Sequence, residues 1–191
     1  MRIISGQYKG RRLSPPRNLP VRPTTDMSKE ALFNVLNNHV HFQDLRVLDL
    51  FTGTGNISFE FASRGCKPII CVDTDKGCIK YIKQVTAEFE FEITPLQNDV
   101  FKFLESHQSK YDLIFADPPY GMELMQFEKM VALIFDKHLL EPSGLLIVEH
   151  SKHTKLNQLP QFSFQRNYGG SVFSFFEIKD TNSDEGTADS E

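Results

Sequence analysis

This 191-residue chain has only three cysteines, no long apolar run and no secretory signal peptide. A small, odd number of cysteines is not the disulfide framework of a secreted domain. The absence of an apolar run of about 20 residues argues against a membrane-spanning helix. We therefore expect a reduced, cytoplasmic protein without a membrane segment. At this length we expect one well-buried domain, and no internal repeat is visible.

Cysteines and histidines at the spacings of a metal site are lacking as well. Cys66, Cys71 and Cys78 are five and seven residues apart, and Cys71 lies within an apolar run. These spacings are not those of a zinc site, and the six histidines form no pair at ligand spacing. We expect no metal site, and we interpret the cysteines as small buried hydrophobic residues.

A glycine-rich turn lacks one of the three glycines of the dinucleotide-binding fingerprint. Arg46 to Ile57 reads RVLDLFTGTGNI, so that an apolar run with Asp49 leads into Gly53 and Gly55. Ser58 stands where the third glycine would be, which argues against a nicotinamide or flavin cofactor. A glycine turn occurs in many α/β proteins. It also lets the backbone approach a ligand closely, ahead of a helix N-terminus.

Strand and helix patterns alternate along the chain and predict a doubly wound sheet. The last two strand patterns flank Gly169-Gly170 and predict an antiparallel hairpin. We expect a mostly parallel, seven-stranded α/β sheet with helices on both faces and an antiparallel edge. The expected strands are 46–51, 68–73, 92–97, 111–117, 144–149, 161–168 and 172–178, and the expected helices are 26–39, 55–63, 76–88, 99–106 and 122–138.

Four aspartates lie in, or just after, the end of a predicted strand. Each could simply cap the next helix, and that alternative is sound for Asp99. In an open parallel sheet, however, ligands bind at the carboxyl ends of the strands, where these side chains would converge. Four carboxylates suit a ligand with hydroxyls, an amine and a positive centre, such as S-adenosylmethionine. The four are Asp49, Asp73, Asp99 and Asp117.

The segment Asp117-Pro118-Pro119-Tyr120 follows the apolar run 111–116. Its two prolines remove two backbone donors and stiffen the chain. The Asp117 carboxylate and the Pro118 carbonyl can then accept both N–H groups of an exocyclic amine on a nucleobase, with Tyr120 as a stacking surface. An ordinary strand-terminal turn is the alternative.

Charge is distributed unevenly. The chain carries a net charge of −4, yet residues 1–29 contain seven Lys and Arg against one acid. This basic segment is what a phosphate backbone would meet, unless it is only a solvated arm. The last 12 residues, 180–191, contain five acids and no base, and we expect them to be disordered.

The sequence resembles the RsmD-like family of bacterial 16S ribosomal RNA guanine-N2 methyltransferases over about residues 1–178. Residues 2–13 resemble the family's basic N-terminal hairpin, and 22–34 resemble its R-P-T-x-D segment and first helix. The third likeness is the pair D-L-F-x-G-x-G at 49–55 and D-P-P-Y at 117–120. Asn56 departs from the family pattern, as do the hairpin residues 169–174.

The resemblance implies a role for each of these residues. Gly53, Gly55 and Asp49 would hold the methionine end of S-adenosylmethionine, Asp73 its ribose, and Asp99, with Val100, its adenine. Asp117, Pro118, Pro119 and Tyr120 would hold the methyl acceptor. The residues expected to contact RNA are Arg2, Lys9, Arg11, Arg12, Arg22 and Thr24.

The implied organisation is an RNA-contacting extension (1–25), a methyltransferase domain (26–179) and an acidic tail (180–191). The implied partner is ribosomal RNA in an assembling small subunit, bound by a monomer. Three alternatives remain at this point: an adenine-N6 methyltransferase, a protein glutamine methyltransferase, and a non-catalytic RNA-binding module that keeps the cofactor fold. The first two do not account for residues 1–30, and intact site residues argue against the third.

Overall fold

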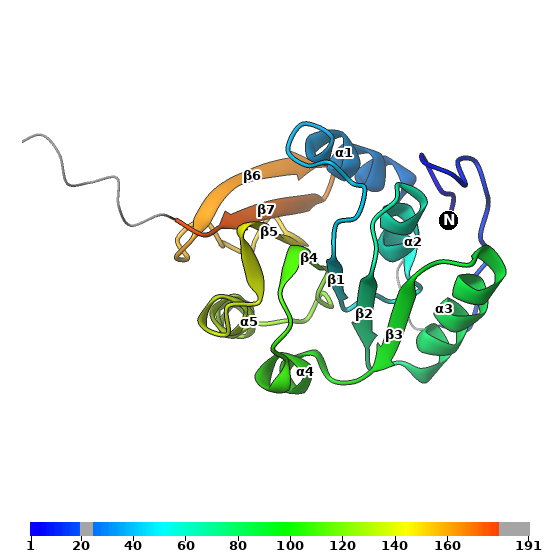
Figure 1. Ribbon diagram of the computed structural model, residues 1–191. Helices are drawn as coiled ribbons and strands as arrows, with labels where there is room; N and C mark the ends of the chain where they lie inside the picture. The colour runs from blue at the N-terminus through cyan, green and yellow to red at the C-terminus, as the bar shows by residue number, and fades with distance from the viewer. Residues whose placement is uncertain (20–24, 180–191) are drawn as a thin grey trace, which may run out of the picture.

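The computed structural model describes residues 1–19 and 25–179, and within these residues seven strands form one sheet. The strand order is β3-β2-β1-β4-β5-β7-β6 (Figure 1). Strands β1 to β5 pair in parallel, and β7 pairs antiparallel with both β5 and β6. This confirms the predicted fold class. The strands are β1 (Val47–Leu50), β2 (Ile69–Asp73), β3 (Ile93–Gln97), β4 (Tyr111–Ala116), β5 (Leu140–Ser151), β6 (Phe162–Tyr168) and β7 (Ser171–Glu177).

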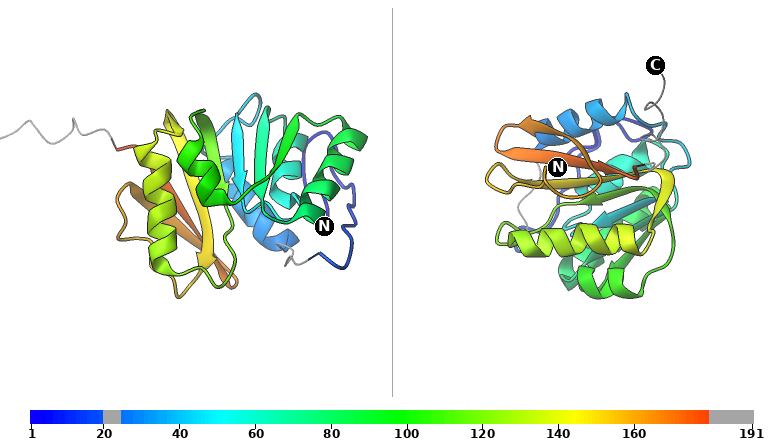
Figure 2. Two further views of the ribbon diagram at one scale, coloured as in Figure 1. Left: turned by 90° about the horizontal axis from the view of Figure 1, so that it is seen from below. Right: turned by 90° about the vertical axis from the view of Figure 1, so that its left-hand side faces the viewer.

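Helices cover both faces of the sheet (Figures 1 and 2). One apolar core lies between the sheet and α1, α2 and α3, and a second lies between the sheet and α4 and α5. The central strands are therefore buried on both sides, which explains why β1 and β4 read as nearly continuous apolar runs. The helices are α1 (Asp26–Leu36), α2 (Asn56–Ser63), α3 (Lys76–Phe89), α4 (Val100–Ser106) and α5 (Leu124–Asp136).

Two predicted boundaries are wrong by several residues. The strand expected at 144–149 begins at Leu140, because Leu140 pairs with Tyr111 before an irregularity that contains Pro142 and Gly144. The helix expected at 26–39 ends at Leu36. Turn-forming residues such as Pro142 and Gly144 indicate a bend in the chain. They do not indicate that the chain pairs with β4 both before and after the bend.

The basic N-terminal segment folds back on itself and packs against the body. Its two arms pair antiparallel, as expected for the short hairpin that the family resemblance implies. Arg2 bridges Arg12, and the backbone N–H groups of Ile3 and Leu13 donate to the carbonyls of Arg11 at 2.9 Å and Met1 at 3.0 Å. Ile3 and Leu13 are buried in the core beneath α1 and α2. Gly6 adopts a φ of 81°, and a Cβ there would lie 1.8 Å from the Ser63 carbonyl oxygen. The segment is therefore docked closely on α2 and is not a solvated arm.

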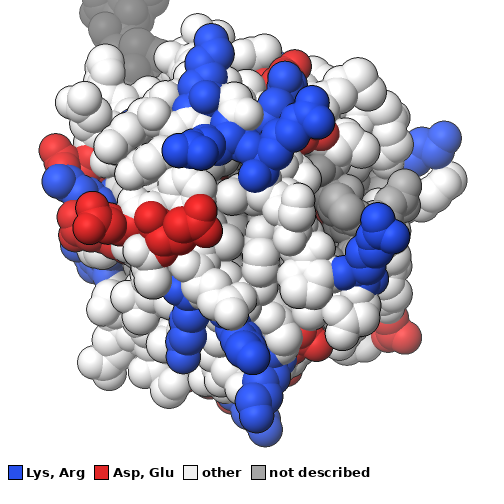
Figure 3. Space-filling model, turned by 90° about the vertical axis from the view of Figure 1, so that its right-hand side faces the viewer, with Lys and Arg blue, Asp and Glu red and all other residues white. Residues whose placement is uncertain are grey.

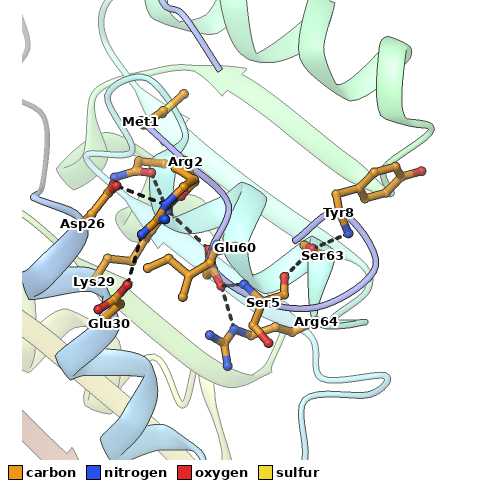
Figure 4. Close-up of polar contacts among 12 residues, drawn as sticks. Met1, Arg2, Ser5, Tyr8, Asp26, Lys29, Glu30, Glu60, Ser63 and Arg64 are labelled. Carbon is orange, nitrogen blue, oxygen red and sulfur yellow. Dashed lines mark hydrogen bonds and ion pairs between the residues drawn. The ribbon is translucent and has the colours of Figure 1, made fainter. Parts of the chain in front are cut away.

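Glu60 of α2 holds this segment in place (Figure 4). Its carboxylate accepts hydrogen bonds from the backbone N–H groups of Ile4 at 2.8 Å and Ser5 at 3.0 Å. The same carboxylate accepts from the Arg64 guanidinium at 2.9 Å and forms an ion pair with Lys29 at 3.3 Å. A buried carboxylate with this many donors is fully compensated, so it fixes the position of the chain around it.

Lys29 lies on α1 and is only 1% exposed. Besides its ion pair with Glu60, its ammonium donates to the Arg2 carbonyl at 2.7 Å and to Asn56 Oδ1 at 2.9 Å. Burial lowers the pKa of Lys29, and the adjacent Glu60 opposes this effect. Counting Lys29 with the basic groups available to a phosphate backbone is therefore wrong. Asn56, which departs from the family pattern, has a structural role as its partner.

Removing the Glu60 carboxylate should destabilise the protein severely. Glu60→Ala leaves the Lys29 ammonium buried without its counter-charge, which typically costs about 3–5 kcal/mol. In a chain of this size we expect the melting temperature to fall by about 10 °C in a thermal unfolding experiment.

Glu30→Ala is the matched control. Glu30 pairs with Arg2 at the surface, where its side chain is 47% exposed, so its loss should cost less than about 1 kcal/mol. Equal destabilisation by the two variants would contradict the assigned role of Glu60.

Candidate active site

The carboxylates predicted to converge do lie on one side of the sheet, at the carboxyl ends of its parallel strands. Asp49 is in β1, Asp73 ends β2, and Asp117 follows β4. These strands are parallel neighbours, with β1 between the other two. Asp99 follows β3, the next strand along this edge. The parallel topology therefore brings four acidic residues from separate segments to one edge.

Asp49 is the most deeply buried of them, with 1% of its surface exposed. Its Oδ2 accepts hydrogen bonds from the hydroxyls of Thr52 at 2.7 Å and Ser58 at 2.5 Å. Burial raises the pKa of Asp49 to about 6, although the two hydroxyls oppose the shift. The side chain is thus a carboxylate that would be stabilised by a positive charge placed beside it.

The glycine-rich turn requires unusual backbone angles at three positions. Phe51, Gly53 and Gly55 have φ values of 58°, 53° and 78°. Such a conformation is rare for a residue as bulky as Phe51 and is found mostly where a site demands it. A Cβ on Gly55 would lie 2.9 Å from Ile82 Cγ1, so the close approach of α3 also requires glycine here.

Asp73 fixes this turn from the neighbouring strand. Its Oδ2 accepts a hydrogen bond from the backbone N–H of Gly53 at 2.8 Å, and its Oδ1 accepts from the backbone N–H of Asp75 at 2.9 Å. The residue expected to bind a ribose therefore also sets the shape of the glycine turn. Its role toward a ribose stays a prediction.

Asp99 and Val100 begin α4. Asp99 caps the helix, because its Oδ1 accepts from the Lys102 backbone N–H at 3.0 Å. The Val100 side chain is buried in the core under α4. Capping, the alternative that the sequence left open for Asp99, is therefore realised, and a contact with adenine stays a prediction for both residues.

The D-P-P-Y segment leaves β4 at the same edge. The Asp117 backbone N–H still donates to the Leu50 carbonyl at 3.3 Å, and Pro118 is buried beside it. Pro119 is exposed, and Tyr120 is 74% exposed. The segment therefore presents an aromatic ring at the surface next to a partly buried carboxylate.

Asp117 to Tyr120 line one side of a small, open pocket whose cavity volume is about 30 Å³. The opposite side comes from α5, β5, the residues after β5 and β7, and sequence reasoning did not identify it. Its members include Phe127, Glu149, His150, Thr154 and Ser171.

Glu149 is the most informative of the missed residues. It is 8% exposed and its Oε2 has no hydrogen-bond partner. Burial raises the pKa of Glu149, and a hydrogen bond with the Ser171 side chain opposes the shift. The signal was present in the sequence, since Glu149 closes the strand predicted at 144–149 as Asp73 and Asp117 close theirs.

Asp117 and Glu149 disfavour each other's charge. Burial raises the pKa of Asp117 well above its ordinary value, and repulsion from Glu149 and then Asp49 adds to the shift. Two carboxylates in one poorly hydrated pocket cannot both ionise without a large cost in free energy. The pocket therefore favours a ligand that brings hydrogen-bond donors or positive charge.

His150 is neutral and held in place. Its Nδ1 lies 2.9 Å from the Ser151 carbonyl oxygen, so Nδ1 carries the proton, and Nε2 accepts from the Ser174 hydroxyl at 2.8 Å. Burial also lowers the pKa of His150. Both ring nitrogens are engaged, so His150 orients the β5–β7 side of the pocket.

The basic segment begins beside the glycine turn. Met1 Sδ lies 3.8 Å from the Thr54 hydroxyl, and Lys29 links the segment to Asn56, the first residue of α2. Of the residues expected to contact RNA, Lys9, Arg11 and Arg12 are exposed, and Arg2 is exposed but paired with Asp26 and Glu30. Figure 3 shows several separate groups of Lys and Arg, with acidic side chains between them. Arg22 and Thr24, and the predicted acidic tail, lie outside the described residues.

The cysteines are free and buried, as the sequence predicts. Burial raises the pKa of Cys66 and of Cys78 to about 12, so neither is a ready nucleophile. Among residues 1–19 and 25–179, no group of three or more His, Cys, Asp or Glu side chains could hold a metal ion. None of the described helices is long and apolar enough to cross a membrane.

Neutralising Asp49 should stabilise the ligand-free protein at neutral pH. The folded-state pKa of about 6 lies above the ordinary 3.8, so stability is lost as pH rises from about 4 to about 6. The loss is on the order of 3 kcal/mol. We expect Asp49→Asn to raise the melting temperature at pH 7.5 by about 5 °C or more, with the difference vanishing near pH 4.

Asp99→Asn is the control for this experiment. Asp99 is an exposed helix cap, and asparagine caps equally well, so no gain is expected. A gain that is the same at pH 4 and pH 7.5 would show that the Asp49 charge is not its cause.

Known proteins are similar to this chain in both sequence and fold. The family model described as Conserved hypothetical protein 95 matches residues 1–177. Ribosomal RNA small subunit methyltransferase D of Haemophilus influenzae is 32% identical over 161 residues, covering 82% of this chain and 81% of the relative.

Two solved structures extend the comparison to the fold. The yhhF protein of Escherichia coli superposes with a TM-score of 0.81 at 24% identity, covering 94% of this chain and 99% of that one. A 16S rRNA N2 methyltransferase, RsmC of Thermus thermophilus, was solved with AdoMet and guanosine; it has a TM-score of 0.69 at 18% identity and covers 84% of this chain and 45% of that one. At these identities the structures establish the fold, and the sequence match establishes the family. The chain belongs to the RsmD family of ribosomal RNA methyltransferases.

Proposed function

We propose that this protein transfers a methyl group from S-adenosylmethionine to the exocyclic N2 amine of a guanine in small-subunit ribosomal RNA. The observation that carries the proposal is the pocket at the end of β4 and β5, in which Asp117 and Glu149 lie beside the buried Asp49. The name of the Haemophilus influenzae relative supports the substrate class.

The residues at this edge fit S-adenosylmethionine by their chemistry. The ligand carries a positively charged sulfonium and amino group, two ribose hydroxyls and an adenine amine. Asp49 is a buried carboxylate that a cation would stabilise, and Gly53 lets the backbone approach closely. Asp73 ends β2 and Asp99 follows β3, in the order expected for ribose and adenine contacts. Bound there, the sulfonium supplies an activated methyl group with a good leaving group.

The chain's own contribution is to position the acceptor amine. Its lone pair is delocalised into the purine ring, so the amine is a poor nucleophile. The Asp117 carboxylate and the Pro118 carbonyl accept its two N–H bonds, which favours a pyramidal nitrogen and aims the lone pair at the methyl group. An N–C bond forms as the S–C bond breaks, and fixed orientation of the two groups supplies several kcal/mol of the acceleration.

Asp117 also receives the proton that the methylated amine must lose. While a sulfonium is nearby, its positive charge lowers the pKa of Asp117. Once the methyl group has moved, that positive charge is gone from the sulfur, and burial with repulsion from Glu149 raises the pKa again. The carboxylate is then basic enough to take the proton, so that no separate general base is needed.

The acceptor base must leave its stack to reach this pocket. Tyr120 is largely exposed at the pocket entrance and offers a ring for stacking on the extruded base. Lys9, Arg11 and Arg12 on the N-terminal segment supply positive charge for the RNA backbone. We propose that the RNA is bound within an assembling small subunit, in the cytoplasm, by a monomer.

Methyl transfer from labelled S-adenosylmethionine tests the proposal. Small-subunit ribosomal RNA, free and in assembling particles, is compared with transfer RNA and duplex DNA, and the products are identified as nucleosides. We expect N2-methylguanosine from the ribosomal substrate only. N6-methyladenine in DNA would overturn the proposed substrate.

Asp117→Ala should lower the rate of transfer by about a hundredfold or more and leave cofactor affinity largely unchanged, because it removes an acceptor for the amine. Asp112→Ala, on the same strand but bonded to Arg46, is the control and should keep its turnover. Unchanged turnover by Asp117→Ala would overturn the mechanism.

Cofactor affinity should depend on pH through Asp49. A bound cation favours the ionised carboxylate, so binding below the ligand-free pKa of about 6 requires loss of a proton. We expect Kd to be constant between pH 7.5 and about 6.5. Below that pH it should rise by up to about tenfold for each pH unit. Calorimetry from pH 5 to 7.5 measures this, and a flat profile for the wild type would contradict it.

A further inference from the structure

Glu149 Oε2 is a buried oxygen without a partner, on a side chain that lines the pocket proposed for the methyl-accepting base. Buried polar atoms are nearly always hydrogen-bonded, because removing them from water without compensation costs free energy. An unpaired carboxylate oxygen, on a side chain more than nine-tenths buried, therefore points to a donor on a ligand.

The neighbouring side chains do not supply that donor. Pro118 and Pro119 have no N–H group, and both nitrogens of His150 are engaged with Ser151 and Ser174. Ser171 interacts with the Glu149 side chain, yet Oε2 remains unpaired. The residue that carries this unpaired oxygen therefore lines the space that the substrate base would enter.

Asp117 and Glu149 are held side by side by the sheet. Strands β4 and β5 are parallel, and Ala116 pairs with Val148, so the next residue on each strand is one of these two acids. Each acid therefore offers acceptor oxygens to the same pocket from a rigid strand end. Two adjacent acceptors match a ligand with two adjacent donors.

We propose that Glu149 accepts the N1–H of the substrate guanine and thereby selects guanine over the other bases. This inference rests on the proposed methyl transfer and assigns its base specificity to one residue. Guanine presents N1–H next to its N2 amine, so both groups donate. Adenine and cytosine each present an unprotonated ring nitrogen next to their amine, and its lone pair would face the Glu149 carboxylate.

The discrimination should be strong, because the wrong base leaves a buried carboxylate unpaired. Sites built to bond a substrate N–H reject analogues that lack it by large factors, on the order of 10⁴. 2-Aminopurine is the sharpest probe, since it keeps the 2-amino group but has an unprotonated N1. It can still donate to Asp117 and Pro118, but it loses the contact with Glu149. Because it also lacks the O6 carbonyl, the comparison with Glu149→Gln is what assigns the loss to Glu149.

The experiment compares methyl transfer to two versions of the ribosomal RNA fragment that the wild type methylates. One version carries guanosine at the target position and the other carries 2-aminopurine riboside. For the wild type we expect kcat/KM for guanosine to exceed that for 2-aminopurine by about a hundredfold or more. Glu149→Gln should narrow this ratio at least tenfold, because its carboxamide can donate to the unprotonated N1.

Glu141→Gln is the matched control, since Glu141 lies at the opposite end of β5, where it pairs with Arg46. In this variant the ratio of kcat/KM for guanosine to kcat/KM for 2-aminopurine should equal that of the wild type. If Glu149→Gln lowers kcat/KM equally for both substrates, the ratio stays unchanged. Glu149 would then be only structural, and the inference would be overturned.

The wild type alone also tests the inference, so that the result does not depend on the folding of a variant. Equal rates on guanosine and 2-aminopurine would overturn the role of Glu149 while leaving methyl transfer intact. Absence of N2-methylguanosine from the wild-type product would overturn the proposed function, and the inference with it.

Discussion

The burial of three carboxylates near the ends of neighbouring strands is the constraint on which this site depends. Asp49, Asp117 and Glu149 come from three neighbouring parallel strands, and burial raises the pKa of each. The fold holds them together by the strong pairing of β1, β4 and β5 in the centre of the sheet. A cation or a set of N–H donors would offset the cost of burying these charges, so ligand binding is favoured at these strand ends.

A second set of buried contacts connects the basic segment to the same edge. Lys29 bonds to the Arg2 carbonyl, to Asn56 and to Glu60, and Asn56 directly follows the glycine turn. From the other side, Asp73 bonds to Gly53 within that turn. The turn is therefore held between β2 and the N-terminal segment. The surface proposed for RNA and the turn proposed for the cofactor form one rigid unit, which suits an enzyme that must align two large substrates.

Much of this architecture could be predicted from the sequence. Apolar runs that alternate with amphipathic segments predicted the doubly wound sheet, and Gly169-Gly170 predicted the terminal hairpin. The acids at strand ends predicted the convergent edge, because parallel strands place their carboxyl ends together. Glu149 was missed although it obeyed the same rule. Its importance lies in an unpaired oxygen and in the nearness of Asp117, and neither is a property of a single strand.

The local sequence determined the elements of this protein: where strands end, where glycines permit a turn, and which segment is basic. The tertiary structure alone decided which charges face solvent. Lys29 reads as one more basic residue near the N-terminus, yet packing of α1 against α2 buries it on Glu60. Asp117 and Glu149 read as two separate acids, yet the pairing of β4 with β5 makes them one coupled site. The reason is physical, because the state of a charge depends on the water and the neighbours that remain around it, and both are set by contacts between residues distant in sequence.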